Sequence, residues 1–195
     1  DHQARYEKDA AYHNGTVWGW NAGFAVTALA RVGAVERAWA LTKNLAGQIT
    51  DLGARGTMSE LLDAHPAASG ALTPSGTYAQ AWSVAEFTRN GYQDYLGVRP
   101  DLGRGALVLE PSPPASWAAV GAEVPLGAGG RLTIDYTRES GSEVWVLAAD
   151  GLGDVATRVL LLGDDGARYL IALTLSEGGS RRVQFDPATH MGAID

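Results

Sequence analysis

The chain has 195 residues, of which 46% are hydrophobic and 19% are charged, and its formal net charge is −7. This composition is typical of a folded globular protein, and the acidic balance disfavours nucleic acid and anionic membranes as partners, so we expect neither. The sequence has no cysteine, which excludes disulfides and thiolate metal sites. Its apolar runs are far shorter than the about 20 residues of a membrane helix, and we expect a cytoplasmic protein.

The first half of the chain has the apolar spacing of helices. Residues 23–32 are almost all apolar or small, which predicts a helix buried on all sides. A second, amphipathic helix is predicted where apolar residues recur at three- and four-residue steps, at Ala38, Leu41, Leu45, Ile49 and Leu52. A loop rich in Gly, Pro and Ser follows over residues 55–76, and a third helix is predicted over residues 77–96.

The second half has the pattern of β structure. Pro100, Pro111, Pro113 and Pro114 would interrupt any helix. Runs rich in β-branched and aromatic residues, separated by Gly-rich or acidic turns, predict strands at 106–109, 132–136, 144–148, 158–162, 169–175 and 182–185. Strands at this spacing favour an antiparallel sandwich. We therefore expect an α + β chain with a helical domain at residues 1–97 and a β-sandwich at residues 98–195.

Three short stretches of the helical half combine aromatic and polar residues, and YHNGTVWGW at residues 12–20 is the first. We expect it at the N-terminus of the buried helix. Aromatic rings stack on the C–H faces of sugars, and His13 and Asn14 can bond to sugar hydroxyls, so the stretch suits a sugar site. Trp18 and Trp20 could equally be packing residues of a core.

The second stretch, GTMSELLD at residues 56–63, contains Glu60 among apolar neighbours. Such surroundings tend to raise the pKa of a carboxyl, which suits acid–base catalysis, although a solvated loop carboxylate is the alternative. In a helical stretch Asp63 would lie about 5–6 Å from Glu60 between Cβ atoms. The two carboxyls of an inverting glycosidase are about 6.5–9.5 Å apart. The partner of Glu60 is therefore expected elsewhere.

The third stretch is GTYAQAWSVAE at residues 76–86. It places Gln80 and Trp82 in the expected first turn of a helix, where polar groups can face a cavity. A helix cap and a core tryptophan are the alternative. The four histidines have no ligand spacing, so we expect no metal and no cofactor.

Taken in order, these stretches resemble a known family. YHNGTVW (12–18), GTMSEL (56–61), QAWSVAE (80–86) and YQDYLGVRPDL (92–102) are similar to the C-terminal end of amylo-α-1,6-glucosidase, the glucosidase part of glycogen-debranching enzymes. The resemblance covers about residues 10–110. More loosely, it extends to inverting glucosidases built on an (α/α)6 toroid, such as glucoamylases and trehalases. It implies that the first domain is the C-terminal portion of such a toroid, with about three helices.

The resemblance also implies roles for individual residues. Glu60 corresponds to the general base that activates the hydrolytic water. The family's general acid is an aspartate on an earlier helix, upstream of this sequence. The candidate substrate-binding residues are His13, Asn14, Trp18, Trp20, Gln80 and Trp82.

These observations predict part of an inverting glycoside hydrolase that releases glucose from α-1,6-linked branch stubs of glycogen-like glucans. Because the sequence opens with Asp1 rather than Met, we expect a fragment that is inactive in isolation. Its expected partners are an α-glucan and either the N-terminal part of the toroid or a second copy. Two alternatives stay open: a carbohydrate-binding or domain-packing module without catalysis, which would not need Glu60, and a toroid glucosidase for another α-glucoside such as trehalose.

Overall fold

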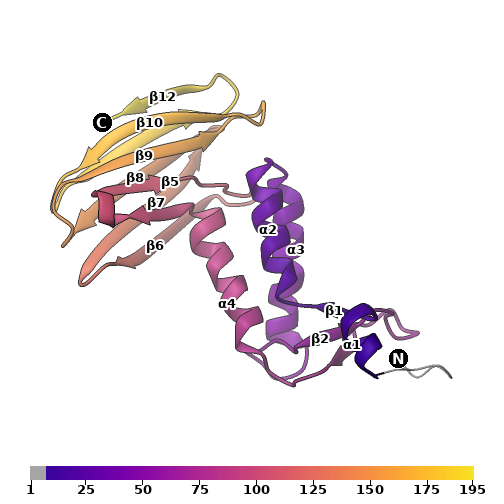
Figure 1. The fold of residues 1–195 in the computed structure, drawn as a ribbon. Helices are drawn as coiled ribbons and strands as arrows, with labels where there is room; N and C mark the ends of the chain where they lie inside the picture. The colour runs from indigo at the N-terminus through magenta and orange to yellow at the C-terminus, as the bar shows by residue number, and fades with distance from the viewer. Residues whose placement is uncertain (1–7) are drawn as a thin grey trace. The chain divides into compact units, whose positions relative to one another are not determined.

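The computed structural model describes residues 8–195, and these residues form two compact units. The first runs to Leu29 and includes Arg37–Asn90, and the second comprises Ala30–Glu36 and Gly91–Asp195. Helices dominate the first unit and strands the second (Figure 1), which confirms the α + β fold class. The toroid and the domain boundary at residues 97/98 stay predictions. Among the described residues, the helices are too short or too polar to cross a bilayer.

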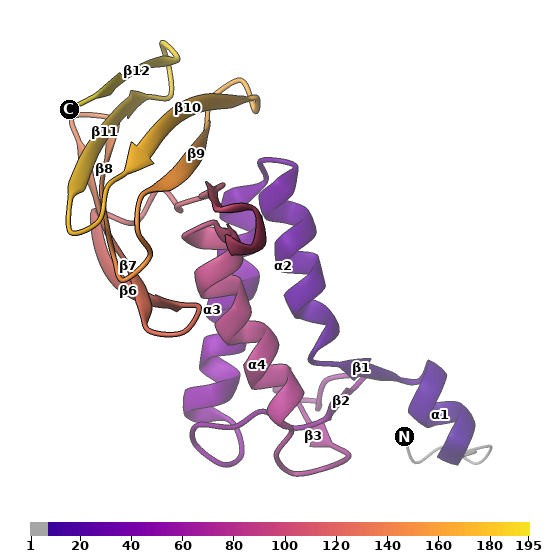
Figure 2. The same cartoon turned by 60° about the vertical axis from the view of Figure 1, so that its left-hand side comes forward.

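The helices of the first unit pack through close contacts between α2 and α4. The four helices are α1 (Lys8–Asn14), α2 (Asn21–Arg31), α3 (Val35–Asp51) and α4 (Ala81–Asn90). Figures 1 and 2 show α2, α3 and α4 side by side. A Cβ atom at Gly23 would lie 2.7 Å from the Cβ of Glu86, and the side-chain amide of Asn90 donates to the Gly23 carbonyl at 2.9 Å. Only glycine therefore allows α2 and α4 to approach this closely.

Helix α2 has a buried face and an open face. Val26 and Ala30 are buried, whereas Phe24 is 52% exposed, and Ala25 and Ala28 are exposed as well. The prediction of a helix buried on all sides is therefore wrong within the described residues. The apolar composition of α2 reflects more surface than this part of the chain covers.

A three-stranded antiparallel sheet lies where the helices of the first unit begin and end. Its strands are β1 (Thr16–Trp18), β2 (Leu61–Asp63) and β3 (Pro74–Ser75), in the order β1-β2-β3. Strand β1 leads into α2, β2 follows α3, and β3 precedes α4. Sequence reasoning expected loops here, because strands of two or three residues are too short to show an alternating pattern.

The second unit contains two sheets. Its nine strands are β4 (Val98–Asp101), β5 (Ala106–Leu109), β6 (Ala119–Leu126), β7 (Gly130–Glu139), β8 (Ser142–Asp150), β9 (Val155–Leu162), β10 (Arg168–Leu175), β11 (Ser180–Asp186) and β12 (Met191–Ile194). Two short helices, η1 (Gly91–Tyr95) and η2 (Leu102–Arg104), flank β4. The five-stranded sheet has the order β12-β11-β8-β7-β6 and is antiparallel throughout. The four-stranded sheet has the order β10-β9-β5-β4, and its β5–β9 pair is parallel.

The hydrophobic core of this unit draws on both sheets. Leu132 and Ile134 of β7 are fully buried, as are Leu107 of β5 and Leu161 of β9. Along β7 these buried residues alternate with more exposed ones, as expected for a strand with one face on a core. Each such side chain contributes about 1.5–3 kcal/mol through burial.

Candidate active site

The three-stranded sheet brings the three motif stretches of the first unit together. Trp18 of β1 pairs with Leu61 of β2. The Glu60 amide donates to the Thr77 carbonyl at 2.9 Å, and the Gln80 amide donates to the Met58 carbonyl at 2.8 Å. Residues from 12–20, 56–63 and 76–86 are therefore fixed side by side by backbone hydrogen bonds.

Glu60 occupies the centre of this arrangement and is only 7% exposed. The Tyr12 hydroxyl donates a hydrogen bond to Oε1, and the Thr77 amide donates to Oε2 at 2.8 Å. These two bonds, the Tyr12 bond foremost, lower the pKa of the Glu60 carboxyl below its ordinary value, although burial opposes them. The expectation that the pKa of Glu60 is raised is wrong, because the hydrogen bonds from Tyr12 and Thr77 outweigh the effect of burial.

A glycine makes the approach of Thr77 to this carboxylate possible. Gly76 has a φ of +71°, and a Cβ atom there would lie 2.8 Å from Glu60 Oε2 and 3.1 Å from Leu61 Cδ1. Any other residue would be strained in its backbone and would press against the carboxylate. Gly76 therefore helps to set the position of Glu60.

Five aromatic side chains extend from Glu60 towards solvent, and we call them the aromatic cluster: Tyr12, Trp18, Trp82, Trp20 and Phe24. The rings of Tyr12 and Trp18 meet edge to face with centroids 4.9 Å apart. Trp82 lies 6.2 Å from both Trp18 and Trp20, and Trp20 lies 5.6 Å from Phe24. Trp82 is 46% exposed, so part of the cluster offers an aromatic face to a ligand.

The Trp20 side chain also carries an unused donor. Its indole N–H is buried and has no hydrogen-bond partner among residues 8–195. A buried donor without an acceptor is costly, and a ligand hydroxyl beside the aromatic cluster could accept this bond.

The other sequence-predicted residues lie at different depths around Glu60. His13 is exposed and meets the ring of Tyr12 edge to face at 5.2 Å. The side chain of Gln80 contributes to lowering the pKa of Glu60, which places it beside the carboxylate. Asn14 is exposed, and its amide donates to the Ala10 carbonyl at 3.2 Å, so it turns back onto α1.

The local setting of these residues differs from the expectation. Residues 12–14 end α1 instead of opening the buried helix, and Trp20 comes immediately before α2. Gln80 precedes α4, which begins at Ala81, and therefore lies outside its first turn. The Trp20 carbonyl accepts a hydrogen bond from the Gly23 amide of α2 at 3.1 Å, and the Gln80 amide donates to the Met58 carbonyl.

Two residues of the site were missed from the sequence. Tyr12 opens the first motif and was the available signal, because a phenol within a polar aromatic stretch can bond to a carboxylate. Thr77 acts through its backbone amide, which no side-chain pattern reveals.

The two acidic residues of the motif stretches other than Glu60, Asp63 and Glu86, have settings of their own. Asp63 ends strand β2, and its amide donates to the Thr73 carbonyl at 2.9 Å, so the helical spacing to Glu60 considered from the sequence does not occur. Glu86 is paired with Arg89 at 2.8 Å. The site therefore contains one buried, ionised carboxylate beside an aromatic cluster, which can remove a proton from water next to a stacked sugar.

The sequence of this unit matches a known family. Residues 2–89 match the family model of amylo-alpha-1,6-glucosidase. The match contains Glu60, Gln80 and the whole aromatic cluster, and it confirms the resemblance to this family over the first three motifs. The fourth motif, at residues 92–102, lies outside the matched residues. The chain has no match among the curated proteins or the solved structures.

Proposed function

We propose that the first unit supplies the general base and part of the glucose-binding wall of an inverting α-glucosidase that removes α-1,6-linked glucosyl stubs from glycogen-like glucans. One observation carries the proposal: Glu60 is buried and kept ionised by Tyr12 and Thr77 beside an exposed aromatic face. The match of residues 2–89 to amylo-alpha-1,6-glucosidase supports the same chemistry.

In the proposed reaction, Glu60 takes a proton from a water molecule as that water attacks the anomeric carbon from the side opposite the leaving oxygen. A general base has to be ionised at the working pH, and the lowered pKa of Glu60 meets this requirement. Tyr12 and Thr77 use one lone pair on each carboxylate oxygen. The side chains of Thr77 and Gln80 also bond to this carboxylate, so we propose that the attacking water takes the place of one of these side-chain donors.

The aromatic cluster would hold the terminal glucose. Trp18 and Trp82 offer ring faces for the C–H side of the pyranose, and the Trp20 indole N–H and the Gln80 amide offer hydrogen bonds to hydroxyls. His13 lies at the exposed rim. The direction in which Asn14 turns makes it the weakest candidate for a substrate contact.

Hydrolysis with inversion also requires a general acid on the other side of the scissile bond. We propose that this acid comes from another segment, as the family resemblance implies, because neither Asp63 nor Glu86 is placed to serve. The 195-residue chain alone should therefore release no glucose from an α-1,6-branched limit dextrin.

Binding of a charged sugar mimic tests the proposal on the chain itself. A protonated imino sugar, 1-deoxynojirimycin, has the shape of glucose and a positive charge that an adjacent carboxylate attracts. We expect Glu60→Gln to weaken its binding at least about tenfold in an NMR titration, and Asp63→Asn to leave it unchanged. Equal affinities for wild type and Glu60→Gln would favour a carbohydrate-binding module without catalysis.

A further inference from the structure

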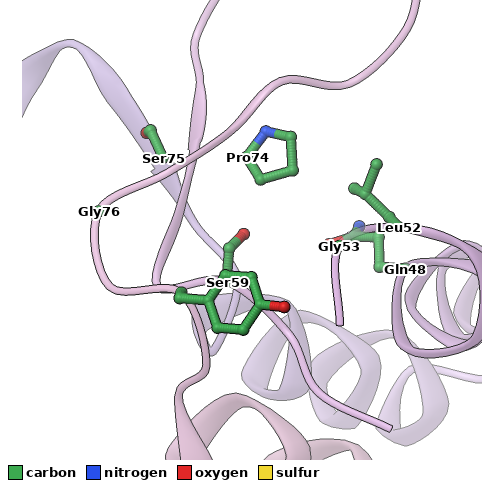
Figure 3. A pocket seen from close by; sticks show the side chains of 8 residues that line it. Gln48, Leu52, Gly53, Ser59, Pro74, Ser75 and Gly76 are labelled. Carbon is green, nitrogen blue, oxygen red and sulfur yellow. The ribbon is translucent and has the colours of Figure 1, made fainter. Parts of the chain in front are cut away.

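A pocket of about 150 Å³ lies beside the Glu60 site, between the C-terminal end of α3 and the β2–β3 hairpin (Figure 3). We call it the hairpin pocket and define it by Gln48, Leu52, Ser59, Pro74, Gly76 and Tyr78. Pockets for drug-sized ligands usually have about 300–1,000 Å³. The hairpin pocket therefore has room for one small ring.

The lining of the hairpin pocket selects for a neutral ligand. Leu52 and Pro74 supply aliphatic surface and Tyr78 supplies an aromatic ring, while the polar side chains are those of Gln48, Ser59 and Ser75. No charged side chain lines the pocket among the described residues. Apolar faces combined with uncharged amide and hydroxyl groups suit a neutral ring that carries hydroxyls.

The polar side chains of the pocket retain unused hydrogen-bonding capacity. Gln48 is only 7% exposed, and its amide gives one N–H to Asn44 Oδ1 at 2.8 Å, which leaves a second N–H to donate. The Ser59 hydroxyl donates to the Leu61 carbonyl at 2.8 Å, so its oxygen is left as an acceptor. Together they offer a donor and an acceptor to one hydroxylated ligand.

The pocket adjoins the Glu60 site through two of its own residues. Ser59 precedes Glu60 in the chain, and the Cα of Gly76 faces the Glu60 carboxylate on its other side, since a Cβ there would lie 2.8 Å from Oε2. Tyr78, at the mouth of the pocket, is 71% exposed. An aromatic ring left this open beside a small polar pocket is available for stacking.

We propose that the hairpin pocket is a second sugar subsite, which holds one glucosyl ring of the glucan whose terminal glucose is bound at Glu60. Tyr78 stacks on the ring, and Gln48 and Ser59 bond to its hydroxyls. The assignment of the ligand as a glucan rests on the proposed function, whereas the binding of a neutral sugar ring rests on the pocket alone.

An NMR titration of the ¹⁵N-labelled 195-residue chain with maltotetraose separates the two sites. The backbone amides of Gly76 and Tyr78 report on the hairpin pocket, and the indole N–H signals of Trp18, Trp20 and Trp82 report on the aromatic cluster. We expect both sets of signals to shift. Tyr78→Ala should raise the dissociation constant obtained from the pocket signals about threefold to tenfold. It should leave the response of the indole signals unchanged.

Tyr92→Ala is the matched control, because Tyr92 is also exposed, at 41%, and does not line the pocket. Its titration should equal that of wild type. Pocket signals that do not respond to maltotetraose, or that respond equally in Tyr78→Ala, overturn the inference. Indole shifts without pocket shifts overturn the second subsite alone, and pocket shifts without indole shifts support the subsite while contradicting the proposed function.

Discussion

Replacing Gly76 with alanine should disturb Glu60 directly. The backbone of Gly76 has a φ of +71°, and residues other than glycine incur about 1–2 kcal/mol in this left-handed conformation. The new Cβ would also lie 2.8 Å from Glu60 Oε2 and 3.1 Å from Leu61 Cδ1. Because Oε2 is the end of a flexible side chain, we expect the carboxylate to move away and lose the Thr77 bond.

Gly56 provides a matched control for the backbone strain. Its φ is +84°, and a Cβ atom there would have nothing within 4 Å. Gly56→Ala should therefore lower the free energy of unfolding by about 1–2 kcal/mol without touching Glu60. Gly76→Ala should lower it by more than this, because the side chains of Glu60 and Leu61 must also shift.

Two measurements separate these effects. Urea denaturation followed by tryptophan fluorescence gives the free energies of unfolding, and ¹³C NMR of the Glu60 carboxyl gives its pKa. In Gly76→Ala the pKa of Glu60 should rise towards its ordinary value, because the Thr77 donor is lost, whereas in Gly56→Ala it should stay low. A low pKa in both variants would refute the view that Gly76 positions this carboxylate.

Three further predictions concern other parts of the molecule. Tyr12→Phe should raise the pKa of Glu60 in the same NMR titration, since it removes the donor that lowers this pKa most; an unchanged value would contradict the assigned bond. Burial raises the pKa of Glu143 above its ordinary 4.5, so folding favours its protonated form, and the contribution of Glu143 to stability should be lost as the pH rises through 4.5 and above. Glu143→Gln cannot ionise, so its free energy of unfolding relative to that of wild type should increase with pH over that range in urea titrations. A decrease with pH would show that folding stabilises the ionised form of Glu143 instead. The open apolar face of α2 should make the chain self-associate in light scattering, and Phe24→Asp should reduce the measured mass; a wild-type monomer at every concentration would refute this.

The sequence predicted every central strand of the second unit and the edge strand β10, but it missed the edge strands β4, β6 and β12. Strand β5 was predicted at residues 106–109 and occupies Ala106–Leu109, because a short, continuous apolar run indicates a buried strand. Strands β4 and β6 contain Pro100 and Pro125 and were missed. Both are edge strands, where a residue without an N–H donor is tolerated.

The site was predictable as a set of motifs but not as a hydrogen-bonded arrangement. Glu60, Trp18 and Gln80 were identified from the residue types of the motifs. In the structure Tyr12 contacts both Glu60 and Trp18, and the Gln80 side chain lies beside the Glu60 carboxylate. The sign of the pKa shift of Glu60 was not predictable, because it depends on a hydroxyl 48 positions away and on a backbone amide. Such long-range donors come from tertiary structure alone.

The most direct test of the claim that Glu60 is a general base is the hydrolysis of α-D-glucosyl fluoride by the 195-residue chain. Fluoride leaves without protonation, so a site with a base and without an acid can still act on this substrate. We predict release of β-glucose above the spontaneous rate, a loss of about 10²–10⁴-fold in Glu60→Gln, and no loss in Asp63→Asn. Hydrolysis by Glu60→Gln at the wild-type rate, or release of α-glucose, would contradict it.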